Sequence, residues 1–166
     1  MFFCMKDTLV IDVETKLSFA DVGGKQNLRA LGISVAGAYS YNRDEFFALE
    51  ERELGKLEAM IREADHVIGF NLKQFDIPVI EPYLAEQDAF SRVAVTDIFE
   101  DAVNFLGHRV GLNALAKATL GAEKSGAGVP GAMAIRKGAR GRRSLVRKEG
   151  FFIGRECHGL VGPETI

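Results

Sequence analysis

The sequence predicts an α/β domain in which an antiparallel three-strand meander and additional parallel strands form one mixed sheet flanked by helices. Three observations lead to this prediction. Residues 8–15 begin with four apolar or β-branched residues, a composition typical of a buried strand. Two further strand-like stretches follow it along the chain. From residue 51 onward, stretches with helical spacing alternate with short apolar runs, as expected where helices connect parallel strands.

The first half of the chain supplies the meander. Residues 16–27 include Gly23 and Gly24 and have the composition of a loop. Residues 28–41 are rich in small and β-branched side chains. We therefore expect a strand, a turn near Gly37, and a second strand that extends to about residue 49.

The second half supplies the helices and the parallel strands. Apolar residues in the stretch 51–64 are spaced three, four and three apart, which places them on one face of a helix. The elements expected after this helix are a strand over 66–71, a helix over 75–86, a strand over 92–96, and helices over 97–106 and 112–120.

The composition divides the chain into two regions. Residues 1–124 have the composition of one globular core, whereas residues 125–166 are rich in Gly and Arg and keep neither helical nor strand periodicity. Residues 136–148 contain seven of the 21 basic residues and no acid, although the net charge of the whole chain is −2. This basic run is compatible with a phosphate-binding surface beside an acidic body, and equally with a solvated tail.

The cysteines and the apolar stretches of the sequence indicate the cellular compartment. Cys4 and Cys157 lie at opposite ends of the chain, without metal-ligand spacing or a disulfide framework, which indicates a reducing compartment. We find no signal peptide and no apolar stretch approaching the ~20 residues of a membrane span. The expectation is a cytoplasmic protein that does not associate with membranes.

Two carboxylates follow the apolar run of the first strand. Asp12 and Glu14 are two positions apart, so they point to the same face of a strand. Neighbouring carboxylates repel one another, and a hard cation such as Mg²⁺ or Mn²⁺ relieves the repulsion. The alternative is that both residues mark the solvated end of a strand.

A second polar pair follows the strand expected over 66–71. Asn71 ends that strand, and Asp76 stands five residues later at the start of the next helix. Asp76 is a candidate metal ligand, but with Pro78 just inside the helix it could equally be a helix cap. Asn71 is also a common turn residue.

In this order the motifs resemble the DEDD family of 3′–5′ exonucleases, which have a ribonuclease H-like fold. Asp12 and Glu14 match the first family motif, and Asn71 with Asp76 matches the second. The stretch 107–121 is also similar to a branch of predicted exonucleases. The resemblance covers about residues 7–124.

The resemblance implies a metal-dependent 3′–5′ exonuclease that hydrolyses phosphodiester bonds of DNA or RNA with two divalent ions, Mg²⁺ or Mn²⁺. Asp12 would bridge both ions, Glu14 would hold one and orient the attacking water, and Asp76 would hold the other. These three residues are the expected catalytic and metal-binding residues.

The resemblance also implies contacts to the substrate, which we expect to be the single-stranded 3′ end of a nucleic acid. Thr15, Asn71 and Phe75 are the expected substrate-binding residues. Stacking on a base is one role for Phe75, as for Phe70, and core packing is the alternative. Asp97 is either an outer acid of the metal site or a cap of the following helix. A helicase or polymerase partner, and the oligomeric state, stay open.

The family's third motif is missing. It consists of a Tyr or His four or five residues before a last Asp, and no aspartate follows Asp101 here. Glu149 is a weak substitute. A frameshift over residues 137–144 would explain the loss, and resequencing of the gene would test it. Two other hypotheses therefore stay open: an inactive relative that still binds metal and nucleic acid, and an unrelated α/β binding domain.

Overall fold

The computed structural model describes residues 7–86 and 88–120. The strands in this part of the chain are β1 (Asp7–Thr15), β2 (Ile33–Ser40), β3 (Glu45–Leu49), β4 (Ala64–Gly69) and β5 (Ala94–Asp97). The helices are α1 (Leu54–Glu63), α2 (Ile77–Ile80), α3 (Ile98–Leu106) and α4 (Leu112–Leu120).

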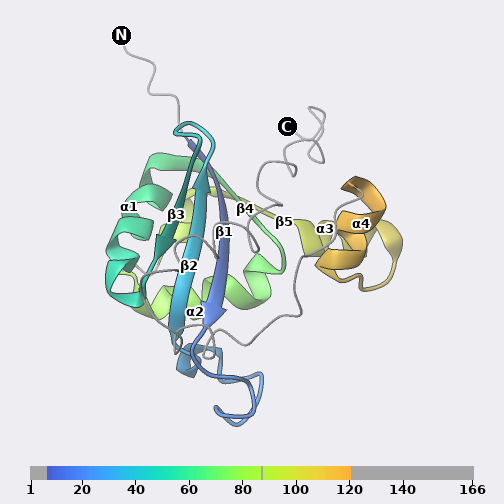
Figure 1. Cartoon of the computed structure of the whole chain (residues 1–166), viewed down its shortest axis with the longest axis horizontal. Coiled ribbons are helices and arrows are strands. Elements are labelled where there is room, and N and C mark those ends of the chain that lie inside the picture. Colours follow the sequence, from blue (N-terminus) through green and yellow to red (C-terminus); the bar gives the residue numbers. More distant parts are fainter. Residues whose placement is uncertain (1–6, 87, 121–166) are drawn as a thin grey trace, which may run out of the picture.

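The five strands form one mixed sheet in the order β3-β2-β1-β4-β5 (Figure 1). β1, β2 and β3 pair as an antiparallel meander. β4 pairs parallel to β1, and β5 pairs parallel to β4. The predicted mixed sheet flanked by helices is therefore confirmed, and β1 is its central strand.

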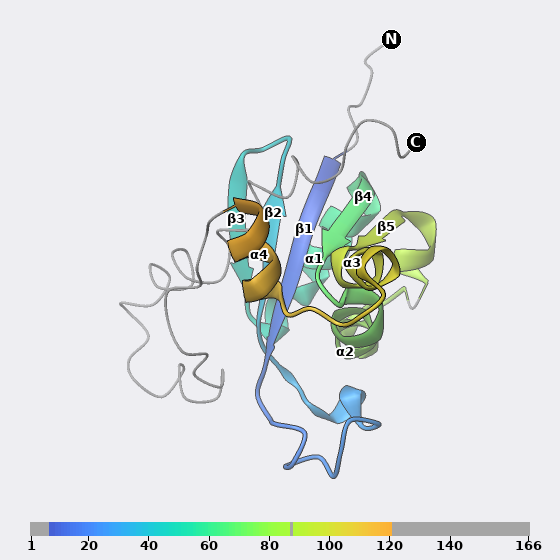
Figure 2. The same ribbon diagram turned by 90° about the vertical axis from the view of Figure 1, so that its right-hand side faces the viewer.

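Alternating side chains of β1 serve two different faces of the sheet. Leu9, Ile11 and Val13 are buried in the main core, together with Leu57 and Ile61 of α1. Figure 2 shows α1 and α2 on this side of the sheet. The other face carries a smaller apolar cluster around Val10, Tyr39 and Ile68. The even-numbered residues of β1 therefore point to this second face, and Asp12 and Glu14 are the ones near the carboxyl end of the strand.

The predicted turn near Gly37 is wrong. Gly37 lies inside β2, where it pairs with Asp12 on one side and Ala48 on the other. The turn of the meander lies at residues 41–44, and Asp44 adopts the left-handed conformation there, with φ of 46°. Small residues in the middle of β2 mark close packing within the sheet rather than a reversal of the chain.

The helix predicted over 75–86 is also wrong in its length. Residues Leu72–Asp76 form a π-helical turn, which we call the π turn, and α2 then covers only four residues. A 3₁₀ turn at Glu81–Tyr83 follows, and Leu84 is already extended. Pro82 explains the early end, because it cannot donate the backbone hydrogen bond that would continue the helix.

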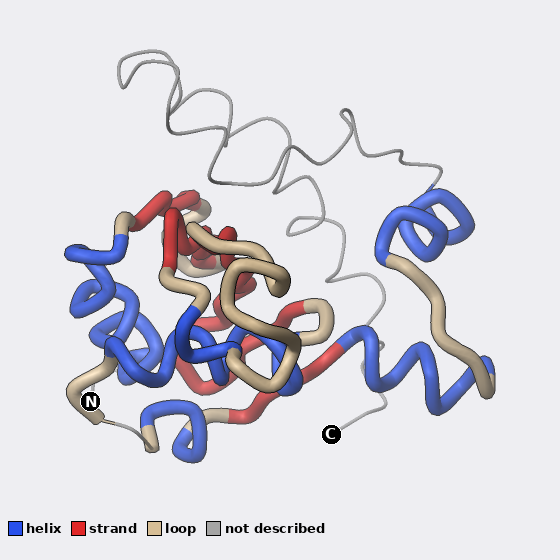
Figure 3. Tube along the Cα trace, turned by 90° about the horizontal axis from the view of Figure 1, so that it is seen from below, coloured by secondary structure: helices blue, strands red, loops and turns tan. Residues whose placement is uncertain are grey.

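α4 lies away from the sheet, beyond α3, as Figures 1 and 3 both show. The predicted C-terminal segment 125–166, including Glu149, lies outside the described residues, as do both cysteines. Among the helices in residues 7–86 and 88–120, none has the length and apolar character needed to cross a membrane.

Candidate functional site

β1 places two carboxylates on one exposed face at its carboxyl end. Asp12 and Glu14 are both exposed, whereas the intervening Val13 is buried in the core. The residue paired with Asp12 on β2 is Gly37, so no side chain stands beside Asp12 on that strand. This arrangement follows from strand alternation.

The π turn delivers a third carboxyl group to the same strand. Asp76 is only 3% exposed, and its Oδ1 accepts a hydrogen bond of 3.0 Å from the backbone N–H of Val13. The Asp76 side chain makes no capping hydrogen bond to α2. The alternative that Asp76 is a helix cap is therefore wrong, because its carboxyl group is directed to β1 instead.

The electrostatics of Asp76 connect it to Asp12. Burial, followed by the negative charge of Asp12, raises the pKa of the Asp76 carboxyl well above its ordinary value of 3.8. The hydrogen bond from the Val13 N–H acts in the opposite direction but is the weaker effect. Two acids from distant parts of the chain therefore repel one another here, and a cation between them would relieve that repulsion.

Asn71 occupies a strained position immediately before the π turn. It is left-handed, with φ of 64° and ψ of 27°, a conformation that Asn tolerates better than most residues. Its side-chain Oδ1 is buried, and among the described residues it has no hydrogen-bond partner. A buried oxygen without a donor is costly, so this atom marks a place where a bound ligand could donate a hydrogen bond.

Asp97 is the cap of α3 and also a link to the π turn. It is 2% exposed, and its carboxylate accepts hydrogen bonds from the backbone N–H groups of Phe99 and Glu100 at the start of α3. The same carboxylate accepts from the N–H groups of Asn71 and Lys73. The predicted capping role is confirmed. The link to the π turn was not predicted, because its donors are backbone groups that no side-chain pattern reveals.

The two predicted aromatic contacts are packed against other aromatic rings. Phe75 is half-buried and meets Phe19 edge to face, with ring centroids 6.0 Å apart. Phe70 meets Phe99 in the same manner at 5.3 Å. Thr15, at the end of β1, donates a hydrogen bond of 2.9 Å from Oγ1 to the Leu17 carbonyl. These contacts fix the three side chains near the carboxyl end of β1. Their role in substrate binding stays a prediction.

The carboxylates near the end of β1 are the groups that could hold a divalent cation. Within residues 7–86 and 88–120, no three His, Cys, Asp or Glu side chains converge closely enough to hold a metal ion together. The negative charge of Asp12 nevertheless acts on Asp76 by raising its pKa. Glu14 lies two residues after Asp12 on the same face of β1. The chemistry of this donor set fits Mg²⁺ or Mn²⁺, which take carboxylate oxygens as ligands.

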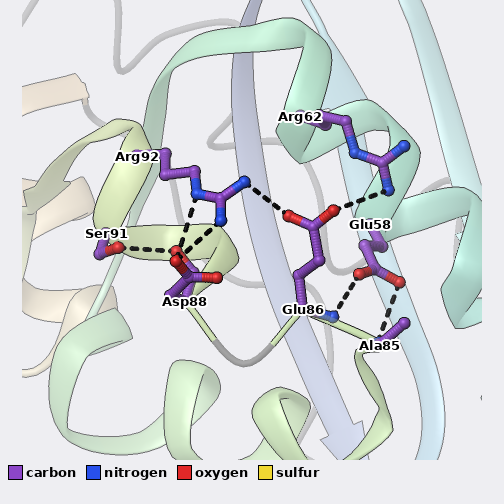
Figure 4. A network of polar contacts seen from close by, with 7 residues as sticks. All are labelled: Glu58, Arg62, Ala85, Glu86, Asp88, Ser91 and Arg92. Carbon is purple, nitrogen blue, oxygen red and sulfur yellow. Dashed lines mark hydrogen bonds and ion pairs between the residues drawn. The ribbon is translucent and has the colours of Figure 1, made fainter.

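A second polar cluster is structural (Figure 4). Glu58 of α1 accepts hydrogen bonds from the backbone N–H groups of Ala85, at 3.1 Å, and Glu86, at 2.7 Å. These amides lower the pKa of Glu58. The Glu86 carboxylate in turn pairs with Arg92 and Arg62. The cluster attaches the segment after α2 to α1, whose apolar side packs on the sheet face opposite Asp12.

Comparison with known proteins identifies the relatives of this fold. The sequence profile of the RNase H superfamily (RNase_H_2) matches residues 9–137, which is more than half of the chain. No curated protein matches the chain.

Three solved structures are similar in fold. RNase D of Trypanosoma brucei in complex with RNA U12 superposes with a TM-score of 0.64 at 16% identity, covering 98% of this chain and 58% of its own. Exonuclease I superposes with a TM-score of 0.53 at 14% identity, covering 87% of this chain and 41% of its own. The family B DNA polymerase of Pyrobaculum calidifontis superposes with a TM-score of 0.50 at 18% identity. The match covers 76% of this chain and 20% of the polymerase chain. The chain thus spans little more than half the length of the RNase D that it matches.

Proposed function

Because the chain belongs to the RNase H superfamily, we propose that it is a metal-dependent 3′–5′ exonuclease acting on a single-stranded end of DNA or RNA. The observation that carries the proposal is the hydrogen bond that holds the buried Asp76 of the π turn to the backbone of β1 at Val13, next to Asp12. Glu14 adds a third carboxylate on the exposed face of β1. The fold likeness to RNase D and exonuclease I supports this choice among the activities of the superfamily.

Asp12, Glu14 and Asp76 would hold the divalent ions, either Mg²⁺ or Mn²⁺. When bound, two such ions stabilise the attacking and leaving oxygens of an in-line displacement at phosphorus. Asp12 is the candidate shared ligand, because it lies on the same face of β1 as Glu14 and next to Val13, to which Asp76 is anchored.

The other residues hold these carboxylates and the substrate in position. The Val13 N–H holds Oδ1 of Asp76 against β1. Asn71 offers its buried Oδ1 to a donor on the substrate. Thr15 and Phe75 stand near the carboxyl end of β1 and are the candidate contacts to the terminal nucleotide. A polymerase or helicase that exposes a 3′ end is the class of partner that suits this reaction.

A second candidate function is binding of metal and nucleic acid without cleavage. One observation favours it. The sequence lacks the Tyr or His and the closing Asp of the third family motif. A chain that lacks a general base and one ligand would retain affinity for its substrate but lose rate.

Incubation of the purified chain with 3′-labelled single strands of DNA and RNA tests the proposal. We expect release of the terminal nucleotide with Mg²⁺ or Mn²⁺ and none with EDTA. Metal-dependent binding without release would support the second function. If the chain shows neither release of the nucleotide nor metal-dependent binding, both candidate functions are contradicted.

A further inference from the structure

Asp97 makes an unusual number of hydrogen bonds for a helix cap. Its Oδ1 accepts from the backbone N–H groups of Asn71 at 2.8 Å, Phe99 at 3.0 Å and Glu100 at 3.4 Å. Its Oδ2 accepts from the Lys73 N–H, at 2.9 Å. Capping of α3 requires the contacts to Phe99 and Glu100 alone, so the other two contacts need a separate explanation.

The two additional contacts hold the start of the π turn. Asn71 is left-handed, and the turn that follows is a π-helical turn, an arrangement that is rare and persists only where its surroundings restrain it. Asp97 restrains its first residues through the Asn71 and Lys73 amides. The contact between Asp76 and the Val13 N–H restrains its end.

We propose that Asp97 is a positioning residue that sets the Asp76 carboxyl group against β1 by holding the backbone of Asn71 and Lys73. Asp97 touches neither substrate nor metal in this role, since four backbone amides occupy its two oxygens. The inference rests on the proposed function, because the group that it positions is the candidate ligand Asp76.

Two substitutions separate positioning from capping. Asp97→Asn keeps one side-chain oxygen, which we expect to take the place of Oδ1 because three amides donate to that atom. The NH₂ group then replaces Oδ2 and faces the Lys73 N–H, which loses its acceptor. Asp97→Ser keeps an efficient cap for α3, but its shorter side chain cannot reach across to the π turn. Positioning predicts that both variants disturb Asp76, whereas capping alone predicts that neither does.

Glu58→Gln is a matched control. Glu58 also accepts two backbone N–H groups from a distant segment, those of Ala85 and Glu86, on the α1 side of the sheet. Replacing Glu58 therefore removes a buried carboxylate that holds two backbone amides, while the π turn keeps all its contacts.

The test uses the full chain and two measurements. Calorimetric titration with Mn²⁺ alone should show affinity about 10–100-fold weaker in both Asp97 variants, the usual effect of losing a partner that orients a ligand. Amide hydrogen exchange should be at least tenfold faster at Val13 and Lys73 in these variants. Glu58→Gln should match the parent in both measurements.

Three outcomes would overturn the proposal: parental exchange at Val13 in both Asp97 variants, parental Mn²⁺ affinity in both, or equal changes in Glu58→Gln. If the parent chain binds no Mn²⁺, the proposed function fails, and exchange at Val13 alone then decides the role of Asp97. If Asp97→Asn does not fold, Asp97→Ser supplies both measurements.

Discussion

Asp12 is the side chain on which the proposed chemistry depends most. Its carboxylate is exposed beside a glycine of β2 and acts electrostatically on Asp76. Asp12→Asn should leave the fold intact and lower metal-dependent cleavage at least about a hundredfold, since bound metal supplies several kcal/mol of transition-state stabilisation. A 3′-end cleavage assay measures this, with the exposed Asp65→Asn as the control for loss of one negative charge. Cleavage by Asp12→Asn at the parental rate would remove Asp12 from the site.

Asp76 should make the stability of the metal-free chain depend on pH. Its pKa is raised by burial and by Asp12, so the folded state holds the proton more tightly than the unfolded state does. Stability is therefore lost as pH rises from about the ordinary value of 3.8 through the raised pKa. Asp76→Asn retains an oxygen for the Val13 N–H and removes this loss.

Urea denaturation in EDTA checks this expectation. At pH 7 the midpoint of Asp76→Asn should exceed that of the parent, and the two should converge below pH 3. Added Mn²⁺ should stabilise the parent but not the variant, because a ligand that binds only the folded state stabilises that state. A lower midpoint for Asp76→Asn at pH 7 would contradict a raised pKa of Asp76 in the folded state.

That Asp12, Glu14 and Asp76 act together stays a prediction from the sequence, and the sequence did not reveal how Asp76 is held. Asp12 and Glu14 follow from strand alternation alone. The alternative of a capping Asp76 could be decided only by the tertiary contact to Val13, which lies 63 residues away in the chain. The anchoring of the π turn by Asp97 was equally hidden, since it uses backbone amides.

At the scale of elements, the tight contact between β4 and the π turn makes Gly69 a sensitive position. An added Cβ would lie 2.9 Å from the backbone oxygen of Ile11 and 3.0 Å from Leu72 Cδ1. Gly69→Ala should therefore destabilise the chain by about 1–3 kcal/mol. Gly55→Ala is the control, because this glycine lies in α1 with nothing within 4 Å, and alanine there should stabilise the helix by up to about 1 kcal/mol. Denaturation midpoints that move in the same direction for both variants would contradict this account.

Element types were easier to predict than element boundaries. The strand and helix types followed from hydrophobic period, and the mixed sheet followed from their order. Composition placed the turn at Gly37, whereas the small residues of β2 serve close packing against β1 and β3. The helix over 75–86 was too long, because the π turn replaces its beginning and Pro82 ends it.

At the scale of the whole molecule, the expected weakness is the C-terminal segment 125–166. Replacing it with a family-like closing helix that bears a Tyr and an Asp should raise the cleavage rate about 10²–10⁴-fold, the usual contribution of general acid–base assistance. Glu149→Gln should change the parental rate little, and the parent should prefer Mn²⁺ over Mg²⁺, because Mg²⁺ demands near-ideal geometry. Initial rates on a 3′-labelled strand measure both. Full Mg²⁺-dependent turnover that Glu149→Gln abolishes would make Glu149 the missing ligand.

The π turn has a consequence for the number of residues between Asn71 and Asp76. The Asp76 carboxyl group reaches β1 from the last residue of a π-helical turn, so deletion of one residue from this turn would change the rise and the direction of its side chain relative to Asn71. The helical hydrogen bonding of α2 would survive such a deletion, but the carboxyl group would leave the Val13 N–H. The segment therefore tolerates substitution at Lys73 or Gln74, whose side chains are exposed, better than it tolerates any change in length. The number of residues between Asn71 and Asp76 matters more for the position of the carboxyl group than the identity of the exposed side chains between them.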